Sequence, residues 1–117
     1  MKTVGIDTNV LLTLRLHREP YFKRAKELLE RCLDGKIKIY LPLPALLEME
    51  WVLRSFYKQP KEKIAQFFDE LLLIDNMLID QKEIIKFSLN LFKNNDRISF
   101  MDSVIVGQIQ NKNYDFL

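Results

Sequence analysis

The order of hydrophobic and polar positions along the chain predicts strands that alternate with helices. Residues 3–6 form a short apolar run that contains the β-branched Val4 and Ile6, which predicts a buried strand. Residues 37–41 alternate between apolar and polar side chains, which predicts a second, half-buried strand. Elsewhere apolar residues recur every three or four positions, and this spacing predicts helices. Helices are expected to begin just after Asp7, at Pro20, Pro42, Pro60 and Asp80, and at Phe100 behind an N-cap at Ser99.

Three local patterns complete this order of elements. Asp80 and Glu83 have the spacing of a capping box. Residues 76–79 are expected to form a turn or a short strand, and residues 116–117 fit the start of another strand. Strands separated by helices imply an α/β fold with a mainly parallel sheet flanked by helices. In such a fold, ligands are expected beyond the carboxyl ends of the strands.

Length and composition narrow the class of protein. The chain has 117 residues, 48% of them hydrophobic, which suits a single domain over residues 1–117. No apolar run approaches the roughly 18 to 20 residues of a membrane span, and the first residues lack a signal peptide's apolar region. We therefore expect a cytoplasmic protein. One cysteine, Cys32, and one histidine, His17, exclude a disulfide and a multi-cysteine zinc site, so any metal is expected to bind through oxygen.

The net charge of +2 conceals an uneven distribution along the chain. Residues 1–63 contain 13 basic and 8 acidic side chains, a net charge of +5. Residues 64–117 contain 5 and 8, a net charge of −3. This asymmetry fits ordinary solvated helix surfaces, and it also leaves a basic half that can steer a polyanion to one face.

Three carboxylates stand where the pattern calls for an explanation. Asp7 follows the first strand and precedes a helix, which fits either an N-cap or a binding site. Asp102 lies in the first turn of the last helix, where the macrodipole favours an anion, and its own face is expected to point inward. Glu50 has Arg54 four residues on and is expected to form a surface ion pair. Glu48 has no such partner, because its neighbours at three and four positions are Pro44, Ala45, Trp51 and Val52.

Together these acids suggest a metal site made of oxygen ligands. Asp7, Glu48 and Asp102 come from separate elements and lack obvious basic partners, which favours Mg²⁺ or Mn²⁺. Such an ion suits phosphodiester hydrolysis, since it can lower the pKa of bound water and neutralise charge on phosphate oxygens. A phosphatase with Asp7 as nucleophile is an alternative, weakened by Asn9 where a second Asp would be expected. The three glycines form no phosphate-binding loop, which excludes a P-loop enzyme.

Three segments resemble one known family. They are residues 4–12 (VGIDTNVLL), residues 46–53 (LLEMEWVL) with Tyr57, and residues 98–105 (ISFMDSVI). In these segments and their order the chain resembles the PIN-domain ribonucleases, specifically the VapC-type toxins of toxin–antitoxin pairs. The resemblance implies a three-layer sandwich, metal-binding and catalytic roles for Asp7, Glu48 and Asp102, and supporting roles for Thr8 and Asn9. It further implies an RNA substrate, an antitoxin partner and a homodimer.

The chain departs from this family at its C-terminal end. The family usually carries a fourth acid after a further strand, and here Asp115 precedes the expected position. The resemblance therefore implies a sheet without its last strands and a metal site without one acid. Two functions follow as alternatives. One is a metal-dependent endoribonuclease, and the other is a PIN-like module that binds an antitoxin-like protein or RNA without cleaving.

Overall fold

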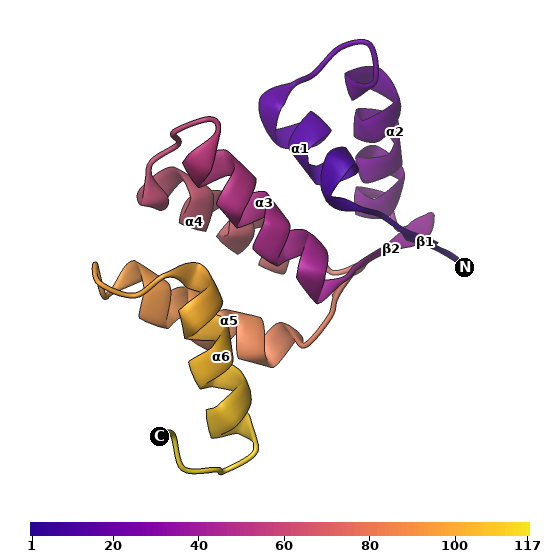
Figure 1. Ribbon diagram of the computed structural model, residues 1–117. Helices are drawn as coiled ribbons and strands as arrows, with labels where there is room; N and C mark the ends of the chain where they lie inside the picture. The colour runs from indigo at the N-terminus through magenta and orange to yellow at the C-terminus, as the bar shows by residue number, and fades with distance from the viewer.

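The alternation of strands and helices predicted from the sequence is present in the computed structural model, which describes residues 1–117. The fold is α/β, with six helices and one three-stranded sheet (Figure 1). The elements are, in chain order, β1 (Lys2–Gly5), α1 (Thr8–Leu16), α2 (Phe22–Leu33), β2 (Ile37–Leu41), α3 (Leu43–Ser55), α4 (Lys61–Leu72), β3 (Met77–Ile79), α5 (Lys82–Lys93) and α6 (Phe100–Asn111). No helix is both long enough and apolar enough to span a membrane.

The sheet is parallel throughout, as predicted. Its strand order is β1-β2-β3, with Val4 beside Ile39 and Ile39 beside Met77. Helices α1 and α2 connect the first two strands, and α3 and α4 connect the second and third. The segment 76–79, for which a turn was the other possibility, therefore contributes a strand. Residues 114–117 have no regular structure, so no strand forms at 116–117.

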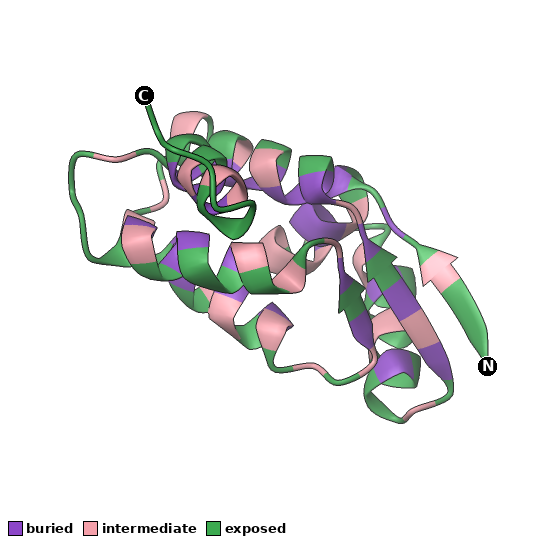
Figure 2. Ribbon diagram, turned by 90° about the horizontal axis from the view of Figure 1, so that it is seen from below, coloured by how far each residue is buried: buried purple, intermediate pink, exposed green.

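Burial differs between the central strand β2 and the edge strand β1. In β2, Ile37, Ile39 and Leu41 are buried, whereas Lys38 and Tyr40 are not, which confirms the half-buried strand. The prediction of a buried strand over residues 3–6 holds only for Ile6, which is buried just beyond the end of β1. Only Val4 in β1 is partly covered (Figure 2), because no helix packs extensively against this strand, whereas α2 packs against β2 and α4 against β3.

Most of the buried hydrophobic residues of the core belong to helices α3 to α6. Met49, Leu53, Phe68 and Phe100 are fully buried there, and each such side chain contributes roughly 1.5 to 3 kcal/mol relative to exposure. Phe100 of α6 makes edge-to-face contacts with Phe68 and Phe92, at ring-centroid distances of 5.2 and 5.6 Å. In Figure 1, α1 and α2 form a pair at one end of the molecule, and α5 and α6 lie at the other.

Two of the three predicted helix caps are present. Asp7 Oδ1 accepts a hydrogen bond from Val10 N–H (3.2 Å), and Ser99 Oγ accepts one from Asp102 N–H (3.0 Å). The capping box at Asp80 was wrong. Asp80 N–H donates to Leu41 O (3.0 Å) and so continues the strand pairing, and α5 begins after Gln81, whose side chain makes no capping bond.

Candidate functional site

Asp7 lies just beyond the carboxyl end of β1, at the point where α1 begins. Ile6 N–H still donates to Tyr40 O (3.1 Å), so strand pairing continues up to the residue before Asp7. Asp7 Oδ1 caps the helix, while Oδ2 has no partner within the protein and the side chain is exposed. Both interpretations of Asp7 are therefore compatible, because one oxygen serves the helix and the other is free to meet a ligand.

The two residues predicted to support Asp7 lie in different environments. Thr8 is buried as the first residue of α1. Asn9 is exposed, and its backbone carbonyl accepts a hydrogen bond from Arg18 Nη2 (3.3 Å). Asn9 lines the same cavity as Asp7, and Thr8 does not.

The two glutamates of α3 have the opposite exposure from the one predicted. Glu48 is exposed, so the apolar residues at three and four positions do not surround its carboxylate. Glu50 is only 3% exposed, and Arg54 Nε donates to its Oε2 at 2.8 Å. The partner of Glu50 was predicted correctly, but its placement on the surface was wrong. Each residue of an α-helix turns the side-chain direction by 100°, so Glu48 and Glu50, two residues apart, point in different directions. Glu50 points to the same side as the buried Leu46 and Leu53.

Asp102 faces solvent at the start of α6. Its backbone N–H is satisfied by Ser99, and its side chain is exposed near the positive end of the helix dipole. The prediction that this face points inward was wrong, because Ile105 is 42% exposed. The buried face of α6 instead carries Phe100, Ser103, Val104 and Gly107.

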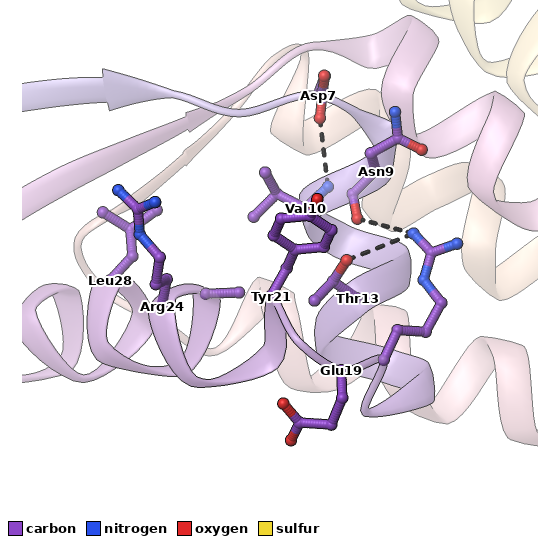
Figure 3. Close-up of a pocket in the computed structure, with 10 residues that line it drawn as sticks. Asp7, Asn9, Val10, Thr13, Glu19, Tyr21, Arg24 and Leu28 are labelled. Carbon is purple, nitrogen blue, oxygen red and sulfur yellow. Dashed lines mark hydrogen bonds between the residues drawn. The ribbon is translucent and has the colours of Figure 1, made fainter.

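A cavity of about 690 Å³ opens beside Asp7, between α1 and the start of α2 (Figure 3). Its apolar surface comes from Val10, Ala25 and Leu28. The remaining lining residues are polar, charged or aromatic, namely Asp7, Asn9, Thr13, Arg18, Glu19, Tyr21 and Arg24. Arg18 Nη2 is tied to Asn9 O and to Thr13 Oγ1, each at 3.3 Å. The site therefore combines a free carboxylate oxygen and two arginines with an apolar surface formed by Val10, Ala25 and Leu28.

Comparison with known proteins places this arrangement in a family. The PIN domain model matches residues 4–117, which include the end of β1 and all of α3 and α6. The chain belongs to the PIN domain family. No curated protein and no solved structure matches it. PIN domains are generally metal-dependent nucleases, so nuclease activity is the function that the family indicates, and the PIN part of the predicted resemblance is confirmed.

Divalent ions are the usual cofactors of PIN domains, and the carboxylates of this one can be tested against that expectation. Asp7, Glu48 and Asp102 are all exposed, and they lie at the N-cap of α1, in α3 and in α6. No group of three or more histidine, cysteine, aspartate or glutamate side chains lies together in a way that could hold a metal ion. The arrangement in this structure therefore does not fit a bound Mg²⁺ or Mn²⁺, and the three-carboxylate site stays a prediction.

Three cavity residues of this PIN domain were not singled out from the sequence. Arg18, Tyr21 and Arg24 belong to the loop after α1 and the start of α2, and they line the same cavity as Asp7 only because those two helices pack together. The basic excess of residues 1–63 was the one signal that could have drawn attention to this region.

Proposed function

We propose that this PIN domain is a ribonuclease that hydrolyses RNA phosphodiester bonds with Mg²⁺ or Mn²⁺ as cofactor. The observation that carries the proposal is the position of Asp7, whose free carboxylate oxygen lies at a strand end and lines a cavity that also holds Arg18 and Arg24. Arginine is well suited to phosphate, which its guanidinium can bind through two parallel hydrogen bonds. A site of this kind suits a phosphodiester substrate better than a neutral one.

The proposal assigns the metal to Asp7, Glu48 and Asp102, with Thr8 and Asn9 as supporting residues. Carboxylate oxygens are the ligands that Mg²⁺ and Mn²⁺ prefer. Holding one ion with all three residues would require α1, α3 and α6 to bring these carboxylates closer together than they are in the structure. Metal binding and catalysis can therefore be tested separately.

The direct test is cleavage of a single-stranded RNA by the purified protein with Mn²⁺ and with excess EDTA. The proposal predicts cleavage that stops when EDTA is added and returns when Mn²⁺ is restored. Cleavage that proceeds equally well in EDTA would contradict the metal requirement. No cleavage of any RNA under either condition would contradict nuclease activity.

A second candidate function is a module that binds RNA or an antitoxin-like protein without cleaving. The absence of a metal-holding group of carboxylates favours it. Calorimetric titration with Mn²⁺ separates the two candidates. Micromolar binding that is lost in Glu48→Ala supports the enzyme, whereas no heat of binding in the wild-type protein supports the module.

We extend the proposal to a biological role, namely the toxin of a toxin–antitoxin pair. Its support is the resemblance of the three motif segments to VapC-type toxins. On the same basis we propose a cytoplasmic homodimer that a cognate antitoxin holds inactive. Induced expression in bacteria should arrest growth with the wild-type protein and not with Asp7→Asn. Growth arrest by both proteins, or by neither, would contradict the toxin role.

A further inference from the structure

We infer that the cavity between α1 and α2 binds one nucleotide of a single-stranded RNA, with the base stacked on Tyr21 and a phosphate paired with Arg24. The inference rests on the proposed ribonuclease function and adds a binding site to it. A cavity of about 690 Å³ lies within the range typical of small-molecule sites and is large enough for a nucleotide. Its floor of Val10, Ala25 and Leu28 is apolar and suits the face of a base.

Arg24 supplies a cation that the protein itself does not neutralise. Its guanidinium makes no hydrogen bond and no ion pair, although its side chain is exposed on the cavity wall. Arg18 differs, because it is committed to Asn9 and Thr13. Of the two acidic residues that line the cavity, Glu19 is the closer to Arg24 in sequence. In Figure 3 its side chain points away from Asp7. An unpaired arginine beside a cavity is suited to an anionic group such as a phosphate.

Tyr21 supplies an unoccupied aromatic face. It is 67% exposed, its ring stacks on no other aromatic side chain, and its hydroxyl makes no hydrogen bond. In Figure 3 the Tyr21 hydroxyl points toward Val10 and Asp7, whereas the Arg24 guanidinium lies farther along α2, beside Leu28. The rings of the adjacent Phe22 and of His17 stack at 4.4 Å, which closes the loop that carries Tyr21. Exposed aromatic rings beside a cationic groove are typical of single-strand binding.

The combination favours a nucleotide over an acidic peptide. Both would pair with Arg24, but a peptide carboxylate would gain little from the Tyr21 ring. A nucleotide uses both features, because it places the face of a base on the ring and a phosphate on the arginine. A single-stranded nucleic acid, unlike a duplex, presents an unstacked base in this way, and the proposed ribonuclease function makes that strand an RNA.

The test is binding of a fluorescently labelled single-stranded RNA in EDTA, so that cleavage does not interfere. Tyr21→Leu should weaken binding roughly tenfold. Tyr21→Phe should bind like the wild-type protein, because stacking needs the ring and not the hydroxyl. Arg24→Gln should weaken binding about five- to tenfold and lower the slope of log affinity against log salt by about 0.7. Lys26→Gln and Tyr114→Leu are matched controls outside the cavity, with Tyr114 66% exposed, and should change binding less than twofold.

The outcomes separate this inference from the proposed function. Wild-type protein that binds no RNA, or variants Tyr21→Leu and Arg24→Gln that bind like the controls, would overturn the inference. A polyglutamate peptide that displaces the RNA and depends equally on Tyr21 would overturn it in favour of a peptide site. Arg24-dependent binding without any cleavage would support the inference and contradict the nuclease. Cleavage with the same KM in all variants would support the nuclease function and contradict the inferred nucleotide site.

Discussion

At the scale of single residues, Glu50 is the one charged side chain placed inside the protein. Arg54 compensates it, with Nε on Oε2 at 2.8 Å and Nη2 on Oε1 at 3.4 Å, and this hydrogen bonding raises the pKa of Arg54 above its ordinary value. The carboxylate has 4% of its side chain exposed and the arginine 49%. Water can therefore replace only part of what Arg54 supplies.

Arg54→Ala should lower the free energy of unfolding by about 1 to 3 kcal/mol, because it leaves a buried carboxylate without its donor. Urea denaturation measures this. Lys86→Ala is the control, since its pair with Glu83 is exposed at 3.5 Å and should be worth less than about 0.5 kcal/mol. Equal losses in the two variants would contradict the account of Glu50.

Cys32 is fully buried, and burial raises the pKa of its thiol above the ordinary value of 9.0. Because the thiolate is the reactive form, native protein should not react with Ellman's reagent at pH 8, whereas protein in urea should react at once. The unfolded thiol loses its proton first, so the wild-type protein should lose stability relative to Cys32→Ala as the pH rises above about 9. Rapid labelling of native protein would contradict the burial.

At the scale of elements, α5 and α6 approach each other closely at Gly107. A Cβ at this position would lie 2.7 Å from Ser88 Oγ and 3.1 Å from Ile84 Cγ2. Ser88 is itself held, because its hydroxyl donates to Ile84 O at 2.7 Å. The absence of a side chain at Gly107 therefore permits the contact between the two helices.

Gly107→Ala should destabilise the protein by about 1 kcal/mol, because overpacking outweighs the gain in helix propensity. In a Ser88→Ala background the loss should shrink, since one clashing atom is gone. Gly5→Ala is the control, as nothing lies within 4 Å of its Cβ, and it should be neutral or slightly stabilising. Thermal unfolding compares these variants and Ser88→Ala with the wild-type protein, and a more stable Gly107→Ala would contradict the close approach.

Element positions were largely predictable from the sequence, and side-chain directions were less so. The strand 37–41 was predicted with its observed bounds, because alternating burial leaves a period of two. Glu48 and Glu50 were misplaced, because their neighbours on the helix do not reveal which face packs against the core. Strand β1 was misjudged for a related reason. An apolar run reports the capacity for burial, whereas actual burial depends on the helices that pack against the strand, as α4 does against β3.

At the scale of the whole molecule, the basic half of the chain and the cavity coincide. Every residue that lines the cavity lies within residues 7–28, inside the half whose net charge is +5, whereas Asp102 belongs to the half with −3. The sum of +2 conceals this, and only the packing of α1 against α2 brings Tyr21 and Arg24 to the side of Asp7. A polyanion should therefore approach from the α1–α2 end.

The central claim is that Asp7 belongs to the reacting centre of a ribonuclease, and cleavage of a single-stranded RNA in Mn²⁺ tests it most directly. Asp7→Asn keeps the size of the side chain and an oxygen that can cap α1, and it should lower the cleavage rate by roughly a hundredfold or more. Asp75→Asn, at an exposed loop position, should cleave within about twofold of wild type. Equal rates for wild type and Asp7→Asn would contradict the claim.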